Sequence, residues 1–204
     1  MYVFFDVGAN SGSDSLGVAR TRTDAVVYAF EPTPKLVAHL KGQSADLPNY
    51  HIIPKAVSNF NGVCTFYVSG NADWGCSSIC QFNDNLETTW PGRKDFKVTD
   101  SVEVDVITLE NFIGEHNITH IDYLHVDAQG QDLQVLMGMG EYISIVRAGQ
   151  IEMPTSHQTK LYRDQKYLDR DAIDFLVKNG FEVTGVFSND AQRNEVNIQF
   201  KRIV

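Results

Sequence analysis

The chain has few cysteines, few basic residues and no long apolar run. Its 204 residues include three cysteines, Cys64, Cys76 and Cys80, an odd number that argues against a disulfide framework and predicts free thiols in a reducing compartment. Cys76 and Cys80 stand four positions apart, but no second ligand pair follows at a spacing typical of zinc sites. The sequence therefore predicts no zinc site.

Basic residues are outnumbered, with 17 Lys and Arg against 26 Asp and Glu and a net charge of -9. A protein that covers a phosphate backbone needs the opposite balance, so the charge argues against nucleic acid as a partner. No apolar run approaches the roughly 18–20 residues of a membrane span, and residues 1–20 lack a basic stretch followed by an apolar one. These absences predict a soluble, cytoplasmic protein without an export signal.

The rest of the composition is that of one globular domain over 1–204, with 43% hydrophobic and 21% charged residues. Apolar β-forming runs alternate with segments of helical periodicity. Strands are expected at 2–5, 25–30, 50–53, 63–68, 102–106, 121–127, 143–151, 181–187 and 196–200. Helices are expected at 16–19, 34–40, 109–113, 131–137 and 169–179.

This alternation predicts a mostly parallel sheet with helices on both faces. The last two strands are joined by a turn that is too short for a crossover, so they must pair antiparallel as a β-hairpin. Residues 70–100 show no sustained periodicity and contain Trp74 and Trp90. We interpret this segment as a long loop or lid that contacts substrate, in which the tryptophans either stack on a sugar or anchor the loop.

Ligands of such sheets bind beyond the carboxyl ends of the strands, so the residues that follow each strand are candidates for the site. They are Asp6 with Gly8 and Gly12, Glu31, Ala56 with Val57, Asp127, and Glu152. Gly8 and Gly12 allow a tight turn and a close approach of the backbone to a ligand. Glu31 follows Gly8 by 23 positions, where a carboxylate can accept the hydroxyls of an adenosine ribose.

The glycine spacing indicates which adenosine ligand fits. Residues 8–12 lack the G-x-G-x-x-G pattern of dinucleotide sites, and Gly17 is followed by Val18 rather than the lysine of a P-loop. A cradle for a diphosphate is therefore not predicted. The remaining possibility is an adenosine ligand that carries an amino-acid tail.

Four segments resemble the FkbM-type class I S-adenosylmethionine-dependent methyltransferases. They are Phe5-Asp6-Val7-Gly8-Ala9-Asn10-Ser11-Gly12, Ala29-Phe30-Glu31-Pro32, residues 121–130 followed by Leu136-Met137-Gly138, and Asn179-Gly180-Phe181. Their order and spacing span nearly the whole chain. The resemblance implies a Rossmann-like methyltransferase fold with a seven-stranded sheet, and methylation of a hydroxyl on a sugar, a glycan or a glycosylated natural product.

The resemblance also implies that S-adenosylmethionine is the cofactor. Its methionine part would be held by Asp6, Gly8, Ala9, Asn10 and Gly12, its ribose by Glu31 and Pro32, and its adenine by Ala56 and Val57, with Asp127 nearby. Two positions depart from the family pattern, because His125 stands where lysine is common and Gln129 where glutamate is common.

Other interpretations of these residues stay open. Asp6 and the glycines could form only a strand-to-helix turn, and Glu31 could be a solvated acid at a helix entry. For His125, a structural role in the core is favoured over a catalytic one.

The methyl transfer itself requires alignment of donor and acceptor and removal of a proton from the hydroxyl. Asp127 and Glu152 end adjacent strands and can converge on the reacting atoms, and His157 follows a few residues later. One of these three is the expected base. Alternatively, Asp127 and Glu152 could hold Mg²⁺, and the sequence does not decide between base and metal.

Two competing functions stay open. One is a non-catalytic module of the same fold that binds an adenosyl ligand or a glycan. The other is a nucleotide-dependent oxidoreductase, which the missing glycine pattern disfavours. Because the first strand begins at Tyr2, we also expect the chain to be a module of a longer polypeptide, working beside glycosyltransferase domains.

Overall fold

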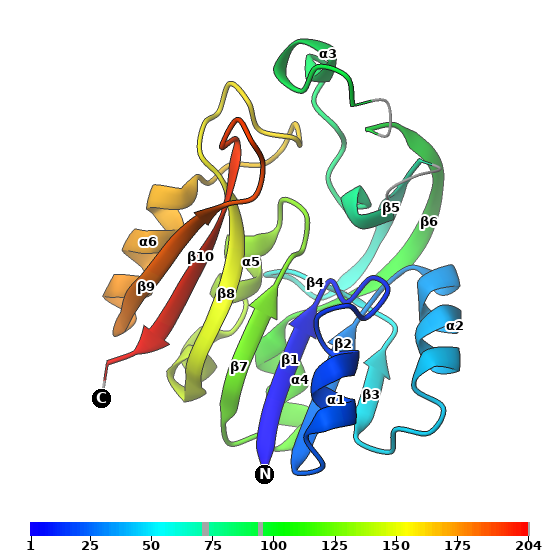
Figure 1. Cartoon of the computed structure of the whole chain (residues 1–204), viewed down its shortest axis with the longest axis vertical. Helices are drawn as coiled ribbons and strands as arrows, with labels where there is room; N and C mark the ends of the chain where they lie inside the picture. Colours follow the sequence, from blue (N-terminus) through cyan, green and yellow to red (C-terminus); the bar gives the residue numbers. More distant parts are fainter. Residues whose placement is uncertain (71–73, 94–95, 204) are drawn as a thin grey trace.

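A seven-stranded sheet forms the centre of the computed structural model, which describes residues 1–70, 74–93 and 96–203 (Figure 1). The strand order is β3 (Tyr50–Ile53), β2 (Ala25–Phe30), β1 (Tyr2–Val7), β7 (Ile121–Val126), β8 (Val146–Pro154), β10 (Glu195–Arg202) and β9 (Phe181–Ser188). The first five strands in this order are parallel, and β10 is antiparallel to both β8 and β9. The predicted fold class is therefore confirmed, including the closing hairpin.

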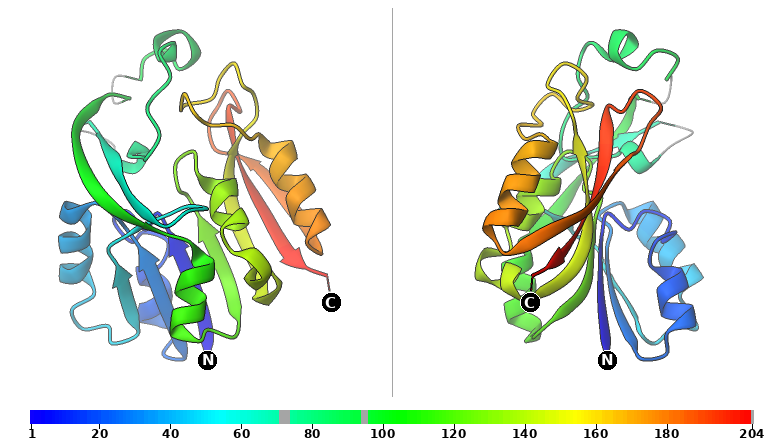
Figure 2. Two further views of the ribbon diagram at one scale, coloured as in Figure 1. Left: turned by 180° about the vertical axis from the view of Figure 1, so that it is seen from behind. Right: turned by 60° about the vertical axis from the view of Figure 1, so that its left-hand side comes forward.

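Helices cover both faces of this sheet, as the right-hand view of Figure 2 shows. On one face, α1 (Leu16–Thr21) and α2 (Pro34–Gln43) pack over Phe4. On the other, α4 (Leu109–His116) packs over Phe5, α5 (Asp132–Met137) packs against β8, and α6 (Asp169–Lys178) packs against β8, β10 and β9. The two cores differ because successive side chains of a strand point to opposite faces. Among the described residues, no helix is both long and apolar enough to cross a membrane.

A smaller sheet rises beside the carboxyl edge of the large one (Figure 1). It contains β4 (Ala56–Val57), β6 (Val98–Ile107) and β5 (Gly62–Ser69), and β5 pairs antiparallel with β6. Between β5 and β6 the chain forms two short helices, η1 (Trp74–Cys76) and α3 (Leu86–Thr89). Two short helices therefore interrupt the segment predicted as a loop at 70–100, and its end belongs to β6.

The predicted strand over 143–151 is wrong at its start. Residues Gly140–Ile145 form a 3-10 helix, and β8 begins only at Val146. The apolar run is too short for periodicity to separate the two conformations. The tertiary fold decides, because Arg202 of β10 donates hydrogen bonds to the carbonyl oxygens of Ile143 and Val146.

Candidate functional site

The loop after β1 fits closely between the ends of its two neighbouring strands. Gly8 has a φ of +85°, and a Cβ atom on it would lie 1.9 Å from the carbonyl oxygen of Asp127. The N–H groups of Gly8 and Ala9 both donate to the carbonyl oxygen of Phe30 at 3.0 Å. Asn10 also has a positive φ, of 48°. Glycine is therefore required at position 8, because any side chain would collide with β7.

Glu31 is built into this loop. Its side chain is 4% exposed, so it is not a solvated acid at the start of α2. One carboxylate oxygen accepts the N–H of Asn10 at 2.9 Å and the other accepts the N–H of Thr33 at 2.8 Å. Burial raises the pKa of Glu31, and these hydrogen bonds partly oppose the rise. A carboxylate oxygen can accept more than one hydrogen bond, so both oxygens retain capacity for a ligand.

Asp6 and His125 form an ion pair beneath the loop. They are register partners on β1 and β7, and His125 Nδ1 lies 2.9 Å from Asp6 Oδ1. Burial lowers the pKa of His125, but the hydrogen bond to Asp6 and its charge outweigh that effect and raise the pKa to about 9. Asp6 Oδ2 is buried and has no hydrogen-bond partner in the described residues. His125 thus has a supporting role under the site, in line with the structural role favoured from the sequence.

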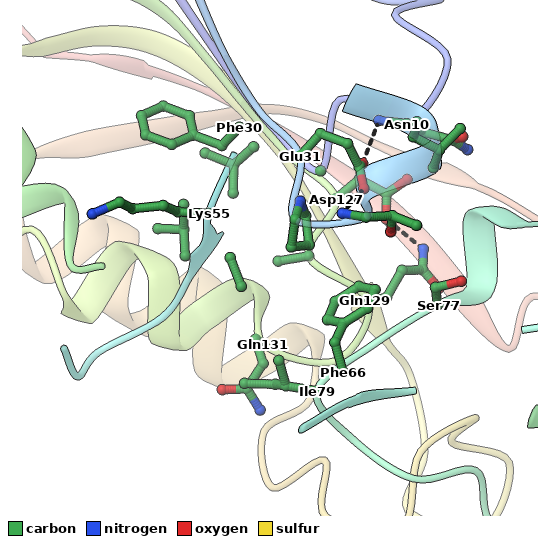
Figure 3. Close-up of a pocket in the computed structure, with 18 of the residues that line it drawn as sticks. Asn10, Phe30, Glu31, Lys55, Phe66, Ser77, Ile79, Asp127, Gln129 and Gln131 are labelled. Carbon is green, nitrogen blue, oxygen red and sulfur yellow. Dashed lines mark hydrogen bonds between the residues drawn. The ribbon is translucent and has the colours of Figure 1, made fainter. Parts of the chain in front are cut away.

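A pocket with about 520 Å³ of empty space opens above this loop (Figure 3). Seven of the expected cofactor residues line it, namely Gly8, Asn10, Glu31, Pro32, Ala56, Val57 and Asp127. Asp6, Ala9 and Gly12 do not line it. They are buried beneath the loop, where Gly12 packs against Leu16 and Leu40. The sequence analysis placed Ala56 and Val57 after the strand at 50–53. In the structure they form β4 of the smaller sheet and reach the pocket from there.

Other walls of the pocket were not predicted from the sequence. Phe30 and Leu36 come from the large sheet and α2, and Phe66 and Ile79 come from the smaller sheet and the segment after η1 (Figure 3). Together with Val57 they make up the apolar part of the pocket lining, which we call the apolar slot. No motif could have indicated Phe66 and Ile79, because they reach the pocket only when the smaller sheet folds over the larger one.

A second pocket, with about 730 Å³ of empty space, lies next to the first. It is lined by Asn10, Gly75, Cys76, Trp90, Arg93, Phe96, Asp127, Gln129, Glu152, Leu161, Asn189, Asp190 and Glu195. Asn10, Gly75, Asp127 and Gln129 line both pockets. The two cavities therefore meet at the end of β7, next to the expected reacting groups.

Gln129 joins the two predicted carboxylates at this junction. Its amide nitrogen donates to Asp127 Oδ1 and lies 3.3 Å from Glu152 Oε2, and its amide oxygen is bonded by the hydroxyl of Tyr162. Asn189, in the turn between β9 and β10, donates to the other oxygen of Glu152. The sequence identified Gln129 only as a departure from a family pattern, and its bridging role appears only in the structure.

Burial raises the pKa of both carboxylates in this cluster. The pKa of Glu152 lies well above its ordinary value, and the neighbouring charge of Asp127 adds to the effect of burial. For Asp127, the hydrogen bond from Gln129 and the charge of His125 partly oppose the effect of burial. A carboxylate with a raised pKa is a stronger proton acceptor, so both groups are suited to acid-base chemistry.

The remaining predicted residues lie elsewhere. His157 is exposed in the loop after β8 and is not among the residues that line the two pockets. Trp90 lines the second pocket, but it is 6% exposed, and its indole N–H donates to the carbonyl oxygen of Thr159 at 2.8 Å, so it anchors its segment. The Trp74 side chain lies outside the described part of the structure.

A metal site would need further ligands around Asp127 and Glu152. In the ranges that the structure describes, no group of three or more His, Cys, Asp or Glu side chains is arranged to hold a metal ion. The two carboxylates provide oxygen ligands of the kind that Mg²⁺ accepts, since it usually retains several waters.

Known proteins share this sequence pattern and this fold. The 2-O-methyltransferase NoeI of Sinorhizobium fredii is 28% identical over 151 residues, which are 71% of this chain and 60% of NoeI. Methyltransferase 1 of Beauveria bassiana is 26% identical over 144 residues, 67% of this chain and 57% of that protein. The chain thus spans less than two thirds of the length of these relatives.

Solved structures show the same fold at low identity. Fibrillarin of Aeropyrum pernix, crystallised with S-adenosyl-L-methionine, has a TM-score of 0.52 at 11% identity, over 98% of this chain and 65% of that one. An rRNA methylase of Streptococcus thermophilus has a TM-score of 0.50 at 10% identity, over 100% and 87% of the two chains. The family model of the methyltransferase FkbM domain matches residues 6–183. The chain belongs to the FkbM methyltransferase family.

Proposed function

We propose that this chain is an S-adenosylmethionine-dependent O-methyltransferase that acts on a sugar hydroxyl. The observation that carries the proposal is the pair of adjoining pockets that share Asp127 and Gln129. One pocket has the slot and carboxylate that an adenosine needs, and the other has polar groups and aromatic rings. Donor and acceptor would meet where the pockets join.

The first pocket fits the proposed cofactor. The apolar slot suits adenine, and both oxygens of Glu31 can accept a ribose hydroxyl. The Thr33 hydroxyl lines the same pocket, is buried and lacks a hydrogen-bond partner among the described residues, so it offers a further polar contact. Gly8 lets the loop lie against the Asp127 backbone in the wall of this pocket. When bound, the cofactor supplies an electrophilic methyl group on a positively charged sulfur.

The chain's own residues supply alignment and a proton acceptor. Glu31 and the slot fix the donor, and the walls of the second pocket orient the acceptor hydroxyl toward the junction. Asp127 or Glu152 accepts the hydroxyl proton as the new bond to oxygen forms. Gln129 holds both carboxylates in place by hydrogen bonds. In the alternative mechanism, the same two carboxylates would hold Mg²⁺, and the ion would make the hydroxyl more acidic.

A sugar acceptor is supported by the second pocket and by one relative. The pocket combines four carboxyl groups with the amides of Gln129 and Asn189, and such groups pair well with the hydroxyls of a sugar. The relative NoeI is a 2-O-methyltransferase by name. Against an RNA acceptor stands the net charge of -9.

Two finer proposals concern context. None of the three cysteines forms a disulfide within the described residues, which fits a reducing compartment such as the cytoplasm. We also infer that the chain works beside glycosyltransferase domains, which would supply the glycosylated acceptor proposed above.

Ligand binding tests the donor site. We expect S-adenosylmethionine and S-adenosylhomocysteine to bind in calorimetry and to raise the melting temperature, and NAD to do neither. Tighter binding of NAD would refute the proposal. Binding of both sulfur ligands without turnover of any hydroxylated sugar would instead indicate a non-catalytic module.

Carboxylate variants test the chemistry. If one carboxylate is the base, Asp127→Asn or Glu152→Gln should lower turnover about 10²–10⁴-fold at saturating donor. If both hold Mg²⁺, a chelator should abolish activity and magnesium should restore it. Asp122→Asn is a control, because Asp122 lies at the opposite end of β7 and pairs with Arg147. Near-normal turnover in both variants, with the chelator harmless, would exclude both roles and leave His157 to test.

A further inference from the structure

The second pocket contains one carboxylate that the chain leaves without a hydrogen bond. Four acids line the pocket, and three are held by hydrogen bonds, Asp127 by Gln129, Glu152 by Gln129 and Asn189, and Asp190 by the N–H groups of Gln192 and Glu195. The fourth is Glu195, which is 9% exposed. In the described part of the chain, its carboxylate makes no hydrogen bond or ion pair. A buried carboxylate without a partner is costly unless a ligand pairs with it.

The strand register places Glu195 beside the proposed reacting groups. Asn197 is opposite Glu152 and Glu195 is opposite Pro154 in the antiparallel pair of β10 and β8. Alternate residues share a face, so Glu195 and Glu152 point to the same side, in diagonal positions roughly 7–8 Å apart between their backbones. This spacing corresponds to neighbouring groups on one small ligand.

The charges around Glu195 are mainly of its own sign. Arg93 is the basic residue among those that line the second pocket, against four acids. Burial raises the pKa of Glu195 to about 8, the charges of Asp127, Asp132 and Asp190 add to the rise, and Arg93 opposes it. Four carboxyl groups thus share this pocket with one guanidinium group, and burial disfavours the ionised form of Glu195. A positively charged ligand group would relieve this imbalance.

We propose that Glu195 binds a protonated amino group of the acceptor, so that the acceptor is an amino sugar whose amine lies next to the methylated hydroxyl. This inference rests on the proposed methyltransferase function and names the substrate class of the same site. Glu195 lines the proposed acceptor pocket and not the donor pocket, so the positively charged groups of the methyl donor do not pair with its carboxylate.

A neutral hydroxyl and a metal ion fit this position less well. A hydroxyl could accept or donate one hydrogen bond but would leave the excess of negative charge unchanged. A metal ion would need several ligands around Glu195, and no such group of three or more His, Cys, Asp or Glu side chains occurs in the described ranges. An ammonium group provides both the charge and the donors.

Calorimetry on the protein saturated with S-adenosylhomocysteine tests the inference. The probes are glucosamine and galactosamine, each compared with its N-acetylated form and with the parent hexose. We expect the free amines to bind at least about tenfold more tightly, the range for a hydrogen bond to a charged group. Binding should also release protons, seen as a dependence of the heat on the buffer, because an ammonium group favours the ionised form of Glu195.

Glu195→Gln should abolish this preference without weakening the binding of S-adenosylhomocysteine. Glu182→Gln is the matched control, because Glu182 lies on the neighbouring strand, is exposed and pairs with Lys201. Any of three results would overturn the inference. The acetylated sugars could bind as tightly as the free amines, Glu195→Gln could keep the preference for the free amines, or neither amine could bind. These results leave the proposed function intact if transfer to a neutral sugar is observed. Failure of S-adenosylhomocysteine to bind would instead refute the proposed function.

Discussion

Replacement of Glu31 by glutamine tests both the fold of the loop and the donor site. In the native chain, each carboxylate oxygen accepts one backbone N–H, from Asn10 and from Thr33. A glutamine side chain has a single acceptor oxygen, so its NH₂ group must face one of these two N–H donors. One buried donor then loses its partner, which costs about 1–3 kcal/mol of unfolding free energy.

The same change should weaken the binding of S-adenosylmethionine. The variant lacks the charged acceptor for the ribose hydroxyls, and a hydrogen bond to a charged group contributes about 1.5–3 kcal/mol. The dissociation constant should therefore rise about 10–150-fold. Because burial raises the pKa of Glu31, acidification protonates the native side chain and should narrow the gap between the two proteins.

Calorimetric titration gives the dissociation constant, and denaturant unfolding gives the stability. Glu115→Gln is a suitable control, because Glu115 is exposed on α4 and should change neither quantity. An unchanged dissociation constant in Glu31→Gln would refute the reasoning, even if stability falls, because Glu31 would then support only the loop.

Two further predictions concern the support of this site. Gly8→Ala should lower the free energy of unfolding by at least about 2 kcal/mol, because the new Cβ would lie 1.9 Å from the Asp127 carbonyl oxygen. Gly17→Ala is the control and should be neutral or stabilising, because Gly17 has open space around it in α1. Equal unfolding midpoints of the two variants would contradict the clash. Since the pKa of His125 is raised to about 9, its pairing with Asp6 stabilises the fold fully below pH 6.5, and this contribution, on the order of 2–3 kcal/mol, is lost as the pH rises through 9. Unfolding curves of His125→Gln should therefore depend less on pH over this interval than those of the native chain, and parallel dependences would exclude the ion pair.

Local patterns in the sequence predicted most of the large sheet and the donor loop. Alternating apolar residues and helical periodicity depend on neighbours a few positions apart, so α6 and the hairpin of β9 and β10 agree closely with their predicted ranges. Residues at or just after the last positions of a parallel strand lie at the carboxyl edge of the sheet, which is why Glu31, Asp127 and Glu152 were found. The start of β8 was misplaced because its conformation depends on Arg202, far along the chain.

By itself, the sequence determined the fold class, the family and the positions of the acids at the sheet edge, since these follow from short-range order and motif spacing. Only the tertiary structure decided which side chains face these acids. Gln129 bridges Asp127 and Glu152 because β7 and β8 are parallel neighbours, and Glu195 lines the second pocket because β10 inserts antiparallel between β8 and β9. Such contacts join residues far apart in sequence, and their distances and burial, which set pKa values and ligand preference, exist only after the sheets have packed.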